Sequence, residues 1–140
     1  MAEMLNLDKM IDKLPILLEA IPEIQTVFLF GSYSTIYQTQ FSDIDFAVKY
    51  NRAQSLRDEA ALINKLTIAL GTDQVDLLNL DKAPLAMRFS VISEGRIIYE
   101  RDPIATCDFI ESVIKHYQDY VITMNKFYID YDDSLREAYL

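Results

Sequence analysis

The sequence predicts an α/β fold: a small mixed sheet of about four strands that helices cover mainly on one face. Short apolar segments rich in β-branched and aromatic residues alternate with longer segments of helical periodicity. The 140 residues suit one domain, 1–140, and 51% of them are hydrophobic, which is enough for a core. We expect the core at 26–103, a C-terminal helix at 104–131 and an acidic, aromatic tail at 132–140.

The first elements are a helix and two strands. Apolar residues at helical spacing predict a helix over 6–21, which Pro15 kinks or splits because proline lacks a backbone donor. An apolar strand at 26–30 follows, then a polar loop at 31–42 and a strand of alternating pattern at 43–48. The loop is long enough for the two strands either to pair antiparallel or to cross over.

The alternation of helices and strands continues through the second half of the core. Ser55 as N-cap and Gly71 just past the end delimit a second helix. Its expected buried stripe is Leu56, Ala60, Ile63, Leu66 and Leu70. Residues 74–78 predict a third strand, a short helix ends at Gly95, and 96–99 predict a fourth strand at the edge of the sheet.

The last helix has an apolar and aromatic stripe that is longer than the domain can cover. The stripe comprises Phe109, Val113, Tyr117, Tyr120, Met124, Phe127 and Tyr131. We expect its first half to pack on the sheet as core. Its second half, where Tyr128 and Tyr139 stand among acids, is expected to contact a partner.

Composition disfavours several classes of protein. Twenty-two acidic and 13 basic residues give a net charge of −9, which disfavours direct binding to nucleic acid. No run of about 18 uncharged apolar residues could span a bilayer, and the N-terminus is acidic where a signal peptide is basic. We therefore expect a cytoplasmic location. The single cysteine, Cys107, leaves no partner for an internal disulfide and no cysteine cluster for zinc.

Two aspartates follow the polar loop. Because side chains alternate along a strand, Asp43 and Asp45 project from the same face. Carboxylates so close repel each other unless a proton or a cation lies between them, and the sequence has no Lys or Arg from 31 to 48. Ligands that are all oxygen favour Mg²⁺, or Mn²⁺, over zinc.

Two further features suit phosphate chemistry. Gly31 and Ser32 follow the first strand, where glycine allows close approach of a ligand and serine adds a hydroxyl, so the turn can hold phosphate oxygens. Asp76 is a lone acid in the apolar third strand, and it joins Asp43 and Asp45 if the two strands are neighbours. Three acids around two metal ions suit an in-line displacement at phosphorus.

These residues resemble the signature of the nucleotidyltransferase superfamily that includes DNA polymerase β: Gly-Ser, a spacer of ten residues, Asp-Ile-Asp and a later third acid. The short chain and the segment "GRIIYERDP" are similar to the minimal nucleotidyltransferases. Among these the sequence most resembles the MntA-type antitoxins, which are encoded beside HepT toxins of the HEPN class. The resemblance covers about 26–103.

The resemblance implies a nucleotidyltransferase fold and Mg²⁺-dependent transfer of AMP from ATP to a tyrosine hydroxyl of a HepT-type toxin. The protein would then act as an antitoxin in a hetero-oligomer. Gly31 and Ser32 would hold the β- and γ-phosphates of ATP. Asp43 and Asp45 would bind both metal ions, while Asp76 would bind the catalytic ion and help to deprotonate the attacking hydroxyl.

Two alternatives remain open. Family members often have glycine where this chain has Ile36, a β-branched residue in the polar loop. This departure favours a binding antitoxin that neutralises its toxin by complex formation alone. The other alternative is a nucleotidyltransferase that modifies a small molecule, although such enzymes generally add a second domain for the acceptor.

Overall fold

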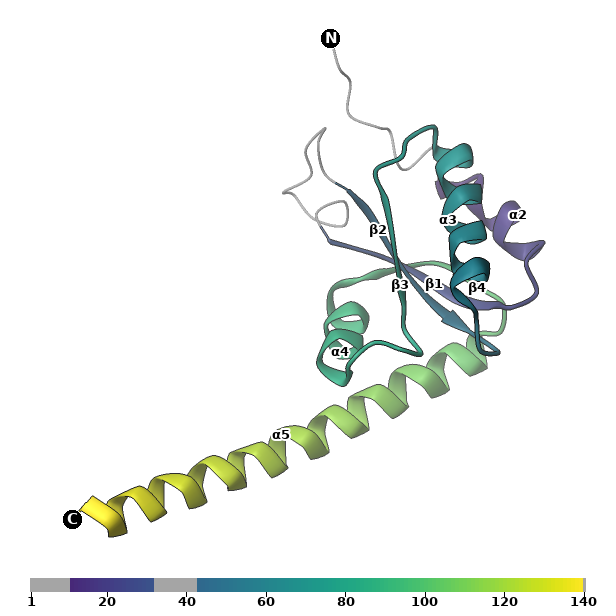
Figure 1. The fold of residues 1–140 in the computed structure, drawn as a ribbon. Helices are drawn as coiled ribbons and strands as arrows, with labels where there is room; N and C mark the ends of the chain where they lie inside the picture. The colour runs from purple at the N-terminus through teal and green to yellow at the C-terminus, as the bar shows by residue number, and fades with distance from the viewer. Residues whose placement is uncertain (1–10, 32–42, 140) are drawn as a thin grey trace.

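The computed structural model describes residues 11–31 and 43–139. Its centre is a four-stranded mixed sheet in the order β3-β2-β1-β4 (Figure 1). β1 (Ile24–Phe30) pairs antiparallel with β2 (Ile44–Tyr50) and with β4 (Arg96–Glu100), and β2 pairs parallel with β3 (Val75–Asn79). The predicted α/β fold with a mixed sheet is confirmed. The first two strands pair antiparallel, which resolves the choice that the sequence left open.

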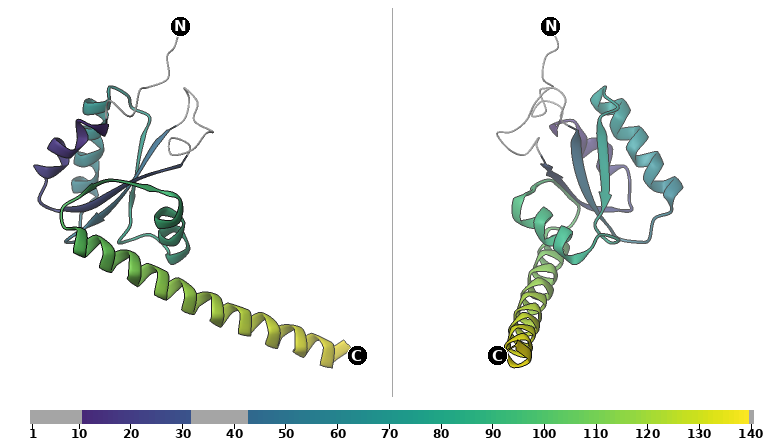
Figure 2. Two further views of the ribbon diagram at one scale, coloured as in Figure 1. Left: turned by 180° about the vertical axis from the view of Figure 1, so that it is seen from behind. Right: turned by 60° about the vertical axis from the view of Figure 1, so that its left-hand side comes forward.

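Helices lie on both faces of the sheet (Figures 1 and 2). α2 (Leu14–Glu19) and α3 (Leu56–Leu70) cover one face, where the larger core cluster lies. α4 (Leu85–Glu94) and the start of α5 (Pro103–Tyr139) cover part of the other face, over a smaller cluster. The helices were expected to cover mainly one face of the sheet, and the larger core cluster does lie on one face. The second face is also partly covered and has a smaller core cluster.

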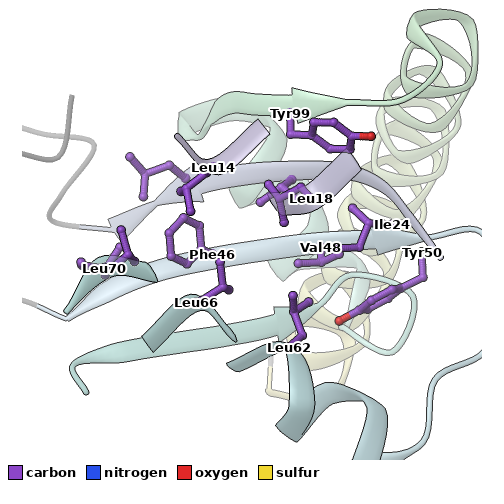
Figure 3. Packing of buried hydrophobic residues seen from close by; sticks show 13 residues of the cluster. Leu14, Leu18, Ile24, Phe46, Val48, Tyr50, Leu62, Leu66, Leu70 and Tyr99 are labelled. Atoms are coloured by element: carbon purple, nitrogen blue, oxygen red, sulfur yellow. The ribbon is translucent and has the colours of Figure 1, made fainter. Parts of the chain in front are cut away.

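The larger cluster fixes which way the side chains of β2 point. Ile44, Phe46 and Val48 are fully buried in it. Figure 3 shows Phe46 among leucines that come from α2 and α3. Burying such a side chain stabilises the fold by about 1.5–3 kcal/mol. Because side chains alternate along a strand, Asp45 projects from the opposite face of β2.

Local sequence signals delimit α3 as predicted. The backbone N–H of Asp58 donates to Ser55 Oγ at 3.1 Å, and the backbone N–H of Ser55 donates to the Asp58 carboxylate at 3.0 Å, which forms a capping box. Gly71 ends the helix in the left-handed conformation, with φ +68°.

The predicted buried stripe of α3 is wrong in its first turn. Leu56 is 80% exposed and Ala60 is exposed. The inward position of this turn belongs to Glu59, whose Oε1 accepts a hydrogen bond of 2.7 Å from the buried Asn79 side chain. The inward line then continues through Leu62, Leu66 and Leu70.

The helix predicted over 6–21 lies partly outside the described residues. A turn at 12–13 precedes α2, and Pro15 occupies the first turn of this helix. A backbone N–H in a first turn has no partner within the helix, so proline causes no loss there. Within the described residues the predicted helix is split by the turn at 12–13, and Pro15 lies at the start of the short helix that follows.

Hydrogen bonds fix the start of α5 to β1. The guanidinium of Arg101 donates to the backbone oxygens of Ile21 at 2.9 Å and Ile24 at 3.0 Å. The hydroxyls of Thr26 and Thr106 form a buried hydrogen bond of 2.8 Å. The start of α5 therefore has a defined position on the domain.

α5 is longer than predicted. It continues to Tyr139, so that residues 132–139 are helical and do not form the expected tail. At 1.5 Å per residue its 37 residues span about 55 Å. Its first part lies along the domain and the rest projects away from it (Figures 1 and 2). In the described part of the chain, neither α5 nor any other helix is long and apolar enough to cross a membrane.

Candidate active site

The predicted site residues gather at one end of the sheet, where β1 ends and β2 and β3 begin. Gly31 directly follows β1, and Asp43 directly precedes β2. Asp45 is the second residue of β2, and Asp76 is the second residue of β3. Ser32, like Ile36, lies outside the described residues, so the roles expected of them stay predictions.

Asp45 and Asp76 are neighbours on adjacent parallel strands. The two residues are Cα partners in the β2–β3 pairing. A hydrogen bond of 2.8 Å from the backbone N–H of Ile44 to the Gln74 carbonyl fixes this register. Partners in a parallel pair project from the same face of a sheet, so both carboxylates lie on the face opposite the larger core cluster. Asp76 was predicted to join Asp43 and Asp45 if their strands are neighbours, and β2 and β3 are neighbours.

The three carboxylates act on one another electrostatically. Asp45 is half-buried, while Asp43 and Asp76 are exposed. Burial first, and then the negative charges of Asp76 and Asp43, together raise the pKa of Asp45 from 3.8 to about 6. A fully charged cluster is thus unfavourable without a cation, and the sequence places no Lys or Arg between 31 and 48.

The chemistry of this cluster suits a divalent metal ion. Its donors are carboxylate oxygens, the ligands that Mg²⁺ and Mn²⁺ prefer, and a cation between them would remove their mutual repulsion. Over 11–31 and 43–139, no group of three His, Cys, Asp or Glu side chains already stands close enough to hold a metal ion. Binding would therefore draw Asp43, Asp45 and Asp76 closer together than they stand here.

The structure also has an apolar groove, of which the sequence indicated only one side. An apolar groove with a volume of about 460 Å³ opens between α4 and α5. The ring of Phe89 from α4 stacks on Tyr117 from α5 at 3.8 Å between centroids, and Ile92 and Val121 also line the groove. The aromatic stripe indicated the α5 side. No sequence signal indicated the α4 side, because which helix lies beside α5 depends on the tertiary fold.

The mixed sheet, with a turn glycine at the end of β1 and acids at the start of β2 and β3, defines a domain of the nucleotidyltransferase class. The chain belongs to the polymerase beta nucleotidyltransferase family, whose model matches residues 12–104. The family resemblance stated from the sequence is thereby confirmed, and the chain is a nucleotidyltransferase.

Its relatives include an enzyme that modifies proteins. The protein adenylyltransferase MntA of Shewanella oneidensis is 37% identical over 99 residues, which cover 69% of this chain and 67% of that protein. A solved structure of the toxin–antitoxin with AMP-PNP matches with a TM-score of 0.70 and 31% identity, over 88% of this chain and 96% of that one. A complex of the tri-AMPylated Shewanella oneidensis HEPN toxin with the MNT antitoxin matches with a TM-score of 0.68 and 28% identity, over the same shares.

The raised pKa of Asp45 predicts that metal affinity depends on pH. Below about pH 6 the carboxyl of Asp45 holds a proton, which a metal ion must displace. We expect the affinity for Mn²⁺ to fall by up to about tenfold for each pH unit below 6 and to level off above 7. Electron paramagnetic resonance of free Mn²⁺ between pH 5.5 and 7.5, with circular dichroism to check the fold, measures this. Equal affinities at the two ends of this range would contradict it.

Proposed function

We propose that this protein transfers AMP from ATP to a tyrosine hydroxyl of a HepT-type toxin and thereby acts as the antitoxin. The observation that carries the proposal is the position of Asp43, Asp45 and Asp76 at the same end of the sheet, with Asp45 paired with Asp76 and in contact with Gly31. The relative MntA is a protein adenylyltransferase, and the related complexes contain AMP-PNP or a tri-AMPylated HEPN toxin, which supports ATP as donor and a toxin as acceptor. The expected cytoplasmic location is part of the same proposal.

We assign the three aspartates as ligands of two Mg²⁺ ions, and Gly31 and Ser32 as the residues that hold the β- and γ-phosphates. When bound, the ions neutralise charge on the phosphates and orient the attacking and leaving oxygens. The acceptor oxygen forms a bond to the α-phosphorus, the bond from that phosphorus to the bridging oxygen breaks, and pyrophosphate leaves. Asp76 takes the proton of the hydroxyl. Its exposure suits this role, because the hydroxyl arrives from solvent on another protein.

α5 offers a surface for such a partner. Ile114, Val121, Tyr128 and Leu135 recur every seven residues, and Val121, Tyr128 and Leu135 are exposed. This spacing is typical of a helix that packs lengthwise on another helix. The two members of this series nearest the domain, Ile114 and Val121, line the apolar groove between α4 and α5. We infer that a helix of the toxin lies along α5 and that its end reaches this groove.

The proposal is tested by label transfer between purified proteins. With Mg²⁺ and ATP labelled at the α-phosphate, we expect the toxin to gain label and the mass of one or more AMP units. ATP labelled at the γ-phosphate should transfer nothing, and EDTA should abolish the reaction. If the toxin is neutralised in a stable complex but gains no label with Mg²⁺ or Mn²⁺, the protein is a binding antitoxin and the proposed catalysis is wrong.

A further inference from the structure

Gly31 lies directly against the side chain of Asp45. A β-carbon placed on Gly31 would overlap Asp45 Oδ2, and it would stand 3.1 Å from Cγ and 3.3 Å from Cβ of the same residue. The strand register explains this contact. Phe30 and Asp45 are Cα partners across the β1–β2 pair, so the next residue of the chain turns over the Asp45 side chain.

The backbone conformation of Gly31 does not by itself account for this contact. Gly31 has φ +78°, a conformation that favours glycine. Gly71 has nearly the same conformation, with φ +68°, but a β-carbon placed there would meet nothing within 4 Å. The two glycines therefore share the conformational requirement, and only Gly31 has a carboxylate in the space where a side chain would begin.

We propose that Gly31 is a positioning residue for Asp45: its missing side chain leaves the space that this carboxylate occupies. The metal-binding part of the inference rests on the proposed function. In Gly31→Ala the backbone up to Phe30 is held by the pairing of Phe30 with Asp45 of β2, whereas the carboxylate is the end of a short side chain. The Asp45 carboxylate is therefore the group that moves, away from its place beside Asp76. Gly31 would then serve metal binding as well as the phosphates.

The first experiment measures Mn²⁺ binding without nucleotide. We expect Gly31→Ala to weaken Mn²⁺ binding at least tenfold, because the ligand Asp45 is displaced before any phosphate is present. The matched control Gly71→Ala introduces the same methyl group at a similar φ in open space, and it should leave Mn²⁺ affinity unchanged. If Gly31→Ala keeps wild-type affinity for Mn²⁺ and loses only ATP binding, Gly31 acts on the phosphates alone and the inference is wrong.

The second experiment tests the contact in the metal-free protein, so it does not depend on whether AMP transfer occurs. Thermal unfolding in EDTA is compared for Gly31→Ala in the wild type and in Asp45→Ala, which empties the space. In the wild-type background, we expect Gly31→Ala to lower Tm more than Gly71→Ala does. In the Asp45→Ala background, we expect Gly31→Ala to lower Tm no more than Gly71→Ala does. Folding of Gly31→Ala only when Asp45→Ala is also present would support the inference equally. The inference would be overturned if Gly31→Ala lowered Tm equally in the two backgrounds. It would also be overturned if Gly31→Ala failed to fold in both backgrounds while Asp45→Ala alone folded.

Discussion

Asp45→Asn is expected to abolish AMP transfer and at the same time to stabilise the metal-free protein. The substitution keeps the shape of the side chain but removes the charge on which metal binding depends. A catalytic metal ion supplies several kcal/mol of transition-state stabilisation, so we expect the rate of labelling to fall on the order of 10³-fold. Labelling of the toxin from α-labelled ATP measures the loss.

The gain in stability follows from the pKa of the same residue. The pKa is about 6 in the folded protein against 3.8 for an unperturbed aspartate, so at pH 7 the folded state holds a charge that its surroundings disfavour. This penalty is complete above pH 6 and disappears as the pH falls toward 3.8. Asparagine has no such penalty. With solvent screening allowed for, the free energy of unfolding should rise by about 1–2 kcal/mol at pH 7 and should change little near pH 4.

Denaturant unfolding in EDTA at the two pH values measures this difference. Asp108→Asn, an exposed residue of α5, removes one negative charge away from the cluster and should leave both labelling and stability close to wild type. If Asp45→Asn labelled the toxin as fast as the wild type does, the assignment of Asp45 to the catalytic site would be wrong. A lower stability at pH 7 would mean that the three carboxylates do not repel one another as described.

Tyr128→Asp combined with Leu135→Asp is expected to weaken toxin binding by about 100-fold or more. Both residues belong to the series Ile114, Val121, Tyr128 and Leu135, which recurs every seven residues along α5, and charges placed at the centre of an apolar interface must lose their water on binding. Two such positions, each contributing about 1–2 kcal/mol, account for the loss. The free energy of unfolding should stay within about 0.5 kcal/mol of wild type, because both side chains are exposed.

The matched control places the same two charges on another face of the helix. Ile122 and Ile129 are 54% and 60% exposed, are seven residues apart and lie about 100° around the helix from Val121 and Tyr128. Ile122→Asp with Ile129→Asp should therefore leave toxin binding nearly unchanged. Titration calorimetry with purified toxin compares the two variants. Equal weakening by both would show that affinity depends on overall charge, and no weakening by either would place the interface elsewhere.

Much of the candidate site could be predicted because its signals are local. The spacing of Asp43 and Asp45 predicts that they share one face, and in the structure Asp45 is the second residue of β2 while Asp43 directly precedes this strand. Ser55 and Gly71 mark the ends of α3 through hydrogen bonds and backbone conformations that involve residues a few positions away. Such signals do not depend on which elements become neighbours in space.

The features that could not be predicted depend on contacts between distant segments. The position of Asp76 beside Asp45 was conditional until the β2–β3 pairing was known. The inward position of Glu59 on α3 depends on Asn79, 20 residues later. The contact between Gly31 and Asp45 depends on the register of β1 on β2. The helix was expected to end at Tyr131 before an acidic tail, but acidic residues at exposed positions are compatible with a helix, and α5 continues to Tyr139.

The projecting half of α5 has a consequence for the energetics of the complex. Beyond Val121 this segment of about five turns has little of the domain to rest on. A helix of that length is only marginally stable in water without tertiary contacts. If the toxin lies along α5 as proposed, part of the free energy of association keeps these turns helical, and we expect proteases to cleave this end faster in the free protein than in the complex.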